Sequence, residues 1–429
     1  MKSLARGMAA VLSTAISIGA AAWLSADQPD PRQMQFADAT GTIRTFSAGG
    51  PLNTDTPFFQ SLGTNGRACV TCHQPSDAWT VTPAHLRERF TASRGLDPIF
   101  QSNDGSNCEG ATPTSLAQRR AAFSLLLNKG LIRVGLTVPP DAEFTVVAVN
   151  DPYACGGALD NVSVYRRVLP STNLAFLSTV MWDGRETRPG VSIVDNLKAQ
   201  AKDATTDHAA GSLHADGAVG GPAALSRQAF FLGINDPLGG NPTGAAFDPR
   251  VFTLFSPWMR SSRNSGNEVT DSRAAIARGE ALFNTRPIVI TGVAGLNDNP
   301  NVGARFSGFC TTCHDTPNSG NHSVSAPLNI GLSDASTRTP DLPLYTVRNK
   351  LTGSEIQTSD PGRAMISGRW NDVGKFKGPI LRGLAARAPY FHNGSAATLD
   401  AVVEFYNTRF MLGLTTREKS DLLAFLRAS

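Results

Sequence analysis

The chain has 429 residues, of which 39 are Lys or Arg and 35 are Asp or Glu. Without Lys2 and Arg6, which lie in a segment expected to be removed, 37 basic residues face 35 acidic ones, and the net charge is +2. So small a charge provides no electrostatic basis for binding a nucleic acid, and that class of partner is excluded. About 400 residues exceed what one hydrophobic core usually supports, so we expect two domains.

The first 26 residues are typical of an export signal. Lys2 and Arg6 precede an uncharged, apolar stretch from Gly7 to Leu24, and small residues suited to cleavage follow it. An uncleaved anchor is the alternative, because the stretch is nearly long enough to span a bilayer, but its content of Ala and Gly favours cleavage. No later segment is long and apolar enough to cross a membrane. We therefore expect a periplasmic protein with no membrane span once residues 1–26 are removed.

Two short runs carry the pattern Cys-x-x-Cys-His, at residues 69–73 and 310–314. The pattern is typical of covalent haem c attachment, in which the two thiols add to haem vinyl groups and the histidine takes the proximal position on iron. The alternatives are thiol redox motifs or one zinc site shared by the four cysteines. The adjacent histidines, the wide separation of the runs and the exported context favour haem. The sequence thus predicts two haem c groups, bound by Cys69, Cys72 and His73 and by Cys310, Cys313 and His314.

The first domain is expected over residues 27–262. Helices are predicted at 83–90 and 116–127, and residues 144–149, three of which are Val, are the best candidate for a strand. A tract rich in Gly and Pro at 211–250 is predicted to form a long surface excursion.

The second domain is expected over residues 263–429. A polar cap opens a predicted helix at 271–283, and a capped amphipathic helix is predicted at 415–426. Helices on both sides of the second attachment run are typical of a cytochrome c domain. We therefore predict a mainly α fold, with two cytochrome c-like haem domains and long irregular loops.

Haem attachment leaves two cysteines unused, Cys108 and Cys155. In an oxidising compartment they could close a disulfide between two loop segments. Sequence alone does not show whether the geometry permits a bridge, so both the paired and the unpaired state stay open.

Four further segments follow one another in a characteristic order: MWDGR at 181–185, FKGPILRG at 376–383, APYFHNGS at 388–395 and TLDAVVEFY at 398–406. Together with the attachment runs, they make the chain resemble the bacterial di-haem cytochrome c peroxidase superfamily, which includes the MauG-type enzymes. The resemblance implies that the N-terminal haem meets peroxide and the C-terminal haem passes electrons. It also implies that Trp182 lies between the haems, although a large ring that packs the domain junction is the plainer alternative.

The resemblance further concerns the distal iron ligands. Tyr406 shares a helical face with apolar residues and falls where the family places the sixth ligand of the second haem. Met365 and Met411 are the rival ligands, and simple packing of Tyr406 in the core is the other alternative. At the first haem, His85 could be the removable distal histidine found in several relatives, or a histidine that merely starts a helix.

Peroxide cleavage needs a group that moves a proton between the two oxygens, and the family uses a Gln and a Glu after the W-D-G-R motif. Gln200 matches the glutamine, but Ala210 stands where the glutamate is expected. Asp203, Asp207 or His208 could take its place, although solvated loop residues are the default expectation. This departure puts ordinary peroxide turnover in doubt.

The predicted function is therefore that of a di-haem peroxidase-type oxidoreductase, which activates hydrogen peroxide or another small oxidant and exchanges electrons with a periplasmic donor or substrate protein. Tyr406 makes the chain resemble MauG-type enzymes, which oxidise Tyr or Trp residues of a partner. A non-catalytic di-haem electron carrier is the alternative, and a redox sensor that docks through 211–250 is a weaker one. The resemblance also implies a calcium ion bound partly by carbonyls near Arg387 and Pro389.

Overall fold

A computed structural model of the chain describes residues 33–47, 50–61, 63–174, 177–208, 255–260, 266–314 and 326–429, and the backbone of 232–234. The expected export signal at 1–26, Ala210 and the expected boundary between residues 262 and 263 lie outside the described residues. So does the 211–250 tract, except for a short strand inside it. All described residues belong to one compact unit, and the division into two domains stays a prediction.

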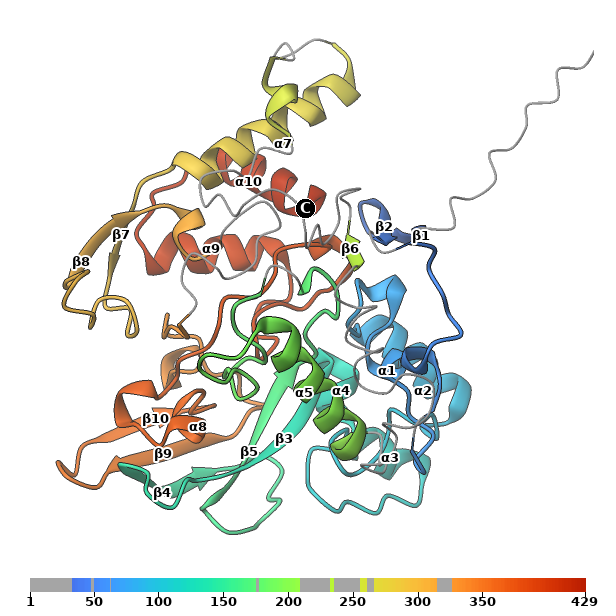
Figure 1. The fold of residues 1–429 in the computed structure, drawn as a ribbon, viewed down its shortest axis with the longest axis vertical. Helices are drawn as coiled ribbons and strands as arrows, with labels where there is room; N and C mark the ends of the chain where they lie inside the picture. Colours follow the sequence, from blue (N-terminus) through green and yellow to red (C-terminus); the bar gives the residue numbers. More distant parts are fainter. Residues whose placement is uncertain are drawn as a thin grey trace, which may run out of the picture. The chain divides into compact units, whose positions relative to one another are not determined.

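The described helices and strands follow one another in groups along the chain (Figure 1). The helices are α1 Cys69–Cys72, α2 Pro83–Ser93, α3 Leu116–Ala122, α4 Ser124–Lys129, α5 Ile193–Asp207, α7 Glu268–Thr285, α8 Ala364–Ser367, α9 Leu399–Arg409 and α10 Thr416–Ala428. The strands are β1 Gln33–Asp38, β2 Gly41–Ser47, β3 Leu131–Thr137, β4 Phe144–Asn150, β5 Asn161–Arg167, β6 Leu232–Ile234, β7 Ile288–Thr291, β8 Arg305–Gly308, β9 Leu344–Asn349 and β10 Glu355–Thr358.

Most of the predicted elements are present. The strand expected at 144–149 is β4, and the helices expected at 83–90, 271–283 and 415–426 are α2, α7 and α10. The helix expected at 116–127 is instead two helices, α3 and α4, because Phe123 leaves helical geometry with φ −103° and ψ 22°. Among the described residues, about 34% are helical and about 19% are in strands or bridges. Strand is thus a larger component than a mainly α prediction includes.

One small sheet joins segments that are far apart in the sequence. Strand β4 pairs antiparallel with β9, and β9 pairs with β10, so the strand order is β10-β9-β4. The residues at the centre of its core are almost inaccessible to solvent, among them Phe144, Val347 and Met365. Strand β4 precedes the expected domain boundary and β9 follows it. The two halves of the chain therefore build one core together.

A second pair of strands positions two buried arginines. Strands β3 and β5 pair antiparallel, from Thr137 opposite Asn161 to Leu131 opposite Arg167. The last residues of β5 are buried, including the charged pair Arg166 and Arg167. Because strand β5 ends inside the protein, it places two guanidinium groups there instead of at the surface.

Helices α7 and α10 lie side by side at the C-terminal end of the fold (Figure 1). They can approach closely because α7 has a glycine at the crossing: a Cβ on Gly279 would lie 2.0 Å from the main-chain oxygen of Asp421 in α10. The carboxylate of Asp421 also receives the guanidinium of Arg278 at 2.6 Å. The pair packs against α9 through Phe283, Val403 and other apolar residues.

Cys108 and Cys155 form a disulfide, with their Cα atoms 5.2 Å apart. The open question from the sequence is thus resolved in favour of the bridge. It joins the loop before α3 to the loop between β4 and β5, and the two cysteines are 47 positions apart in the chain.

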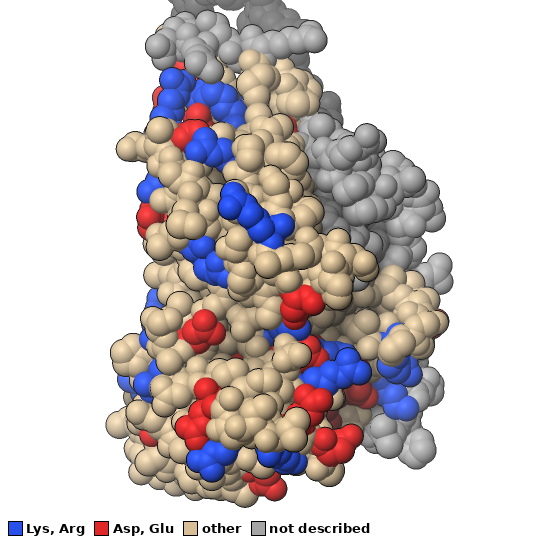
Figure 2. Space-filling view, turned by 90° about the vertical axis from the view of Figure 1, so that its left-hand side faces the viewer, with Lys and Arg blue, Asp and Glu red and all other residues tan. Residues whose placement is uncertain are grey.

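The surface agrees with the small net charge. On the face in Figure 2, acidic and basic side chains are interspersed and most of the area is uncharged, with no large surface of one sign. None of the helices in the described ranges is long and apolar enough to span a membrane.

Candidate haem centres

Each attachment run lies in the wall of its own cavity. The first cavity contains Cys69, Cys72 and His73, and the second contains Cys310, Cys313 and His314. Together with their open mouths, the cavities hold about 1570 and 1750 Å³ of empty space. The lining of each cavity is mostly apolar, which suits the faces of a macrocycle.

The environment of the four cysteines argues against the alternative chemistries. Burial raises the pKa of Cys69 and Cys310 to about 12 and that of Cys72 and Cys313 to about 11. Redox-active thiols have lowered pKa values instead. The two runs also lie in different cavities, and the described part of the chain contains no cluster of three or more His, Cys, Asp and Glu side chains suited to a metal ion. Thiol redox chemistry and a shared zinc site are thus disfavoured.

His73 is held in the form that an iron ligand requires. Its Nδ1 lies 3.0 Å from the main-chain oxygen of Trp79, so a proton on Nδ1 leaves the lone pair of Nε2 available. Burial, together with the charge of His208, lowers the pKa of His73 and favours the neutral imidazole.

In the second cavity, the rings of His314 and Tyr406 meet edge to face. Their ring centroids are 6.5 Å apart and the ring planes are inclined by 77°. The Tyr406 hydroxyl has no hydrogen-bond partner among the described residues, and burial raises its pKa, so it needs a cation nearby to ionise. Neither rival ligand lines the cavity: Met365 packs in the β4–β9 core, and Met411 is 82% exposed.

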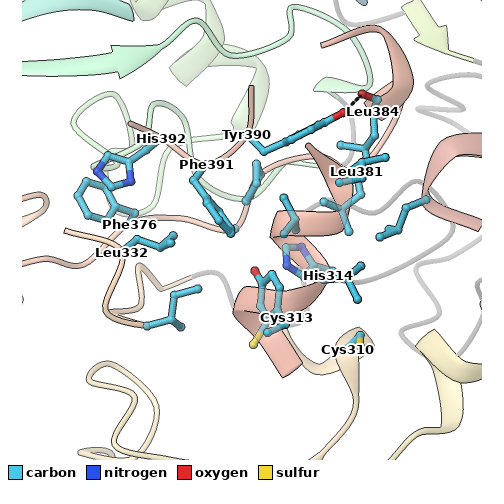
Figure 3. Close-up of a pocket in the computed structure, with 18 of the residues that line it drawn as sticks. Cys310, Cys313, His314, Leu332, Phe376, Leu381, Leu384, Tyr390, Phe391 and His392 are labelled. Atoms are coloured by element: carbon cyan, nitrogen blue, oxygen red, sulfur yellow. Dashed lines mark hydrogen bonds between the residues drawn. The ribbon is translucent and has the colours of Figure 1, made fainter. Parts of the chain in front are cut away.

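Figure 3 shows the arrangement of the second cavity. Cys310, Cys313 and His314 lie together at one side, and Phe376 and His392 lie at the opposite side. The rings of the latter two stack with their centroids 3.9 Å apart. The ring of Phe391 lies between these two groups of residues. An apolar, partly aromatic lining of this kind suits the faces of a haem.

The two cavities share one wall, which we call the shared wall. Its members line both cavities and are Arg167, Val168, Leu169, Pro170, Trp182 and Lys377. Trp182 is only 8% exposed, and its indole Nε1–H donates to the main-chain oxygen of Arg167 at 2.7 Å. Its ring meets that of His392 edge to face, with centroids 6.2 Å apart. Trp182 thus lies in the wall between the cavities, and its place between two haems stays a prediction.

A buried ion network fixes the W-D-G-R motif. Asp183 accepts from Arg166 at 2.5 Å and lies 3.2 Å from Arg185, and Arg166 also donates to both carboxylate oxygens of Asp360 at 2.7 and 2.9 Å. Although burial opposes ionisation, Arg166 and Arg185 lower the pKa of Asp183 to about 2. The main chain next to Trp182 is therefore tied to the segment around Asp360, which lies almost two hundred residues further along the chain.

The first cavity contains Gln200 and His208, both candidates from the sequence. They lie on one face of helix α5 and at its end, eight positions apart, which is close to two turns. His208 Nδ1 lies 2.6 Å from a carboxylate oxygen of Asp104, whose other oxygen lies 2.7 Å from Arg67. Although burial opposes ionisation, His208 and Arg67 lower the pKa of Asp104. The result is a His–Asp pair at the edge of the cavity.

Other candidates lie elsewhere. The ring of His85 pairs with Asp77 at the start of α2, is 44% exposed on its side chain and does not line the first cavity. Asp203 is hydrogen-bonded to Glu186, and Asp207 does not line the cavity either. Hence His208 alone of the three proposed substitutes for the glutamate reaches the cavity. Asp104 and Arg67 were missed, because they precede His208 by more than a hundred residues and belong to no motif.

The chain is similar in sequence to several known proteins. A family model described as RoxA-like, cytochrome c-like matches residues 375–410. The chain is 35% identical over 131 residues to the cytochrome-c peroxidase IdrP2 of Denitromonas iodatirespirans, covering 28% of this chain and 36% of that protein. It is 28% identical over 376 residues to the methylamine utilization protein MauG of Methylorubrum extorquens, covering 84% of this chain and 89% of MauG. A solved MauG-like protein associated with microbial copper homeostasis is 17% identical with a TM-score of 0.37, over 87% of this chain and 85% of that one.

The extent of these matches differs. The chain spans 36% and 38% of the length of the first two peroxidases, but most of MauG. The segment matched by the family model includes His392 and Tyr406, which both line the second cavity. These matches support the resemblance to the superfamily of di-haem cytochrome c peroxidases and MauG.

Proposed function

We propose that the protein is a periplasmic di-haem c oxidoreductase, which activates hydrogen peroxide or another small oxidant in the first cavity and exchanges electrons through the second. In this proposal each of the domains 27–262 and 263–429 holds one haem. The proposal depends mainly on one observation: Trp182 lies in the wall shared by two cavities that each contain an attachment run. A single aromatic ring in contact with both cavities supports electron transfer between their contents.

The residues around the first cavity support proton transfer during peroxide reduction. Bound haem iron would supply the oxidant-binding site and the one-electron chemistry. Cleavage of the O–O bond requires a proton to move from one peroxide oxygen to the other, so that the far oxygen leaves as water. His208 can accept and return that proton, because Asp104 holds its Nδ1 and leaves Nε2 for the cavity. Gln200, on the same helix face, is the donor that stabilises the departing charge.

The contacts of Trp182 bear on how it would carry an electron. Its N–H donates to a main-chain carbonyl, which cannot accept the proton in return. An oxidised Trp182 therefore keeps its proton and stays cationic.

We propose a protein as the electron-donating partner or substrate, as with MauG-type enzymes. Tyr406 supports this variant, because it lines the second cavity beside His314 and its hydroxyl forms no hydrogen bond with another described residue. A tyrosinate ligand would stabilise ferric and higher oxidation states, which are those needed to oxidise a partner.

The non-catalytic electron carrier is the second candidate, and one observation favours it. His208 lines the same cavity as His73, and its charge acts on the His73 imidazole. If His208 were a second axial ligand, the first iron would be closed to small molecules.

Two measurements test the proposal. Mass analysis of the matured protein is expected to find two haem adducts, one on the peptide with Cys69 and Cys72 and one on the peptide with Cys310 and Cys313. Absorption and electron paramagnetic resonance spectra of the ferric protein are then expected to contain one high-spin haem that binds cyanide. Two low-spin irons that ignore cyanide and peroxide would support the carrier, and fewer than two adducts would contradict both candidates.

A further inference from the structure

The guanidinium group of Arg167 is surrounded by main-chain carbonyls. Its Nη1 donates to the oxygens of Lys129 and Gly130 at 2.9 and 3.2 Å, and its Nη2 donates to the oxygen of Arg387 at 3.1 Å. The first two carbonyls end helix α4, and the third belongs to the segment directly before Pro389. Arg167 is 5% exposed. A buried positive charge therefore joins two segments separated by more than 250 residues.

The local backbone has the shape that this contact needs. Gly130 has φ +62°, a left-handed conformation that glycine adopts readily. A Cβ at this position would lie 1.9 Å from Nη1 of Arg167. Only glycine leaves room for the guanidinium at the end of α4.

No carboxylate neutralises Arg167 at ion-pairing distance within the described ranges. Asp77 acts on it only from further away and is itself paired with His85. Burial, together with the nearby guanidinium of Arg387, lowers the pKa of Arg167 to about 10, so the group is still a cation at neutral pH. Its charge is thus balanced chiefly by carbonyl dipoles, which is how proteins also bind hard metal cations.

The main-chain N–H and oxygen of Arg167 also form hydrogen bonds. Its N–H donates to the oxygen of His392 at 2.6 Å, and its oxygen accepts from the indole of Trp182 at 2.7 Å. Both of those side chains line the second cavity, and Trp182 lines the first as well. One residue therefore positions the shared wall through its main chain and fixes a positive charge there through its side chain.

We infer that the Arg167 guanidinium supplies the positive charge in the shared wall and takes the place of the calcium ion expected near Arg387 and Pro389. Calcium needs six to eight oxygen ligands. Here the Arg387 carbonyl is already occupied, and the guanidinium groups of Arg167 and Arg387 would repel a divalent cation. The inference rests on the proposed function, because it assigns to Arg167 a role between two haems.

The first test uses the wild-type protein with both haems attached, after dialysis against EGTA. Calorimetric titration with CaCl₂ is expected to show no stoichiometric binding. The two midpoint potentials are expected to be the same with EGTA and with calcium. Binding of one calcium per chain at micromolar concentration, with a shift of either potential, would overturn the inference.

The second test replaces the charge by an apolar chain of similar length, Arg167→Met. Both midpoint potentials are expected to fall, because the buried cation favours the reduced, less positive state of either iron. Arg409→Met is the matched control: Arg409 also donates to carbonyls, those of Thr291, Gly292 and Ile330, but it does not line the first cavity. Its replacement is expected to leave the first potential unchanged.

The outcomes separate two kinds of failure. Wild-type protein without two haem adducts contradicts the proposed function, whatever its response to calcium. Wild-type protein with two haems that binds calcium at the junction contradicts only the assignment of Arg167. Potentials that are equal in wild type and Arg167→Met would also contradict that assignment. If Arg167→Met does not fold, the wild-type titration still decides.

Discussion

The indole Nε1–H of Trp182 donates a 2.7 Å hydrogen bond to the main-chain oxygen of Arg167. Since both residues line both cavities, this bond lies within the wall that separates the two candidate haem centres. The bond fixes the orientation of the ring and makes a carbonyl, which cannot act as a base, the neighbour of its only acidic proton. The role of Trp182 follows from this bond and from its position.

Replacement of Trp182 by Phe is expected to slow electron transfer between the haems by about tenfold or more, because a phenyl ring is harder to oxidise and lacks the anchoring N–H. Stopped-flow absorption of the reduced protein mixed with peroxide measures this rate. Trp370→Phe is the control, since Trp370 packs against the β4–β9 core and lines neither cavity. Equal rates in the two variants would show that Trp182 only packs the junction.

Replacement of His208 by Ala is expected to slow the reaction of the first haem with peroxide by roughly 10²–10⁴-fold, the usual contribution of a positioned acid–base group. Asp104→Asn should give a smaller loss, because the imidazole remains but loses its carboxylate partner. Asp207→Asn, at the same end of α5 but outside the cavity wall, is expected to react like wild type. Should His208→Ala instead turn a low-spin first haem into a high-spin one, His208 is an iron ligand and the electron carrier is favoured.

Replacement of Tyr406 by Phe is expected to remove the sixth ligand of the second haem and to convert its ferric spectrum to high spin. Tyr406→Met should restore a low-spin iron with a higher potential, because thioether ligation favours the reduced state. Tyr390→Phe is the control: this tyrosine lines the same cavity, but its hydroxyl donates to the Leu384 carbonyl at 2.8 Å. An unchanged spectrum in Tyr406→Phe would rule out ligation.

The double variant Cys108→Ser, Cys155→Ser is expected to lower the free energy of unfolding by about 2–4 kcal/mol, since the bridge closes a loop of 47 positions in the unfolded chain. Denaturant titration of the haem-loaded protein measures the change. Both cysteines lie outside the cavities, so haem content and peroxide reactivity should be retained. A variant as stable as wild type would show that the bridge contributes nothing to folding.

The features that could be predicted from the sequence are those encoded by residues close to one another along the chain. The attachment runs specify thiols and imidazole within five positions, and the pattern at 144–149 gives strand β4 to within one residue. Helix α5, which brings Gln200 and His208 to one face, was not predicted, since residues 203–208 were expected in a loop. The interrupted helix at Phe123 was missed because its cause is tertiary: the ring packs against Phe100 and Leu126.

Features that depend on distant residues were not accessible in this way. The pairing of β4 with β9, the contact of Asp104 with His208 and the enclosure of Arg167 by the ends of two other segments each join residues about 40 to 220 positions apart. No local pattern marks Asp104 or Arg167 as special. The expectation of calcium came from a motif whose ligands are carbonyls, and side-chain identity does not show that a guanidinium occupies one of them.

The central claim is that two haems, joined by Trp182, act together on a small oxidant. Titration of the fully reduced protein with hydrogen peroxide, followed by absorption, tests it most directly. Reduction of one peroxide to two waters consumes two electrons, so a single equivalent is expected to oxidise both haems. Oxidation of one haem alone, or none, by that equivalent would contradict the account.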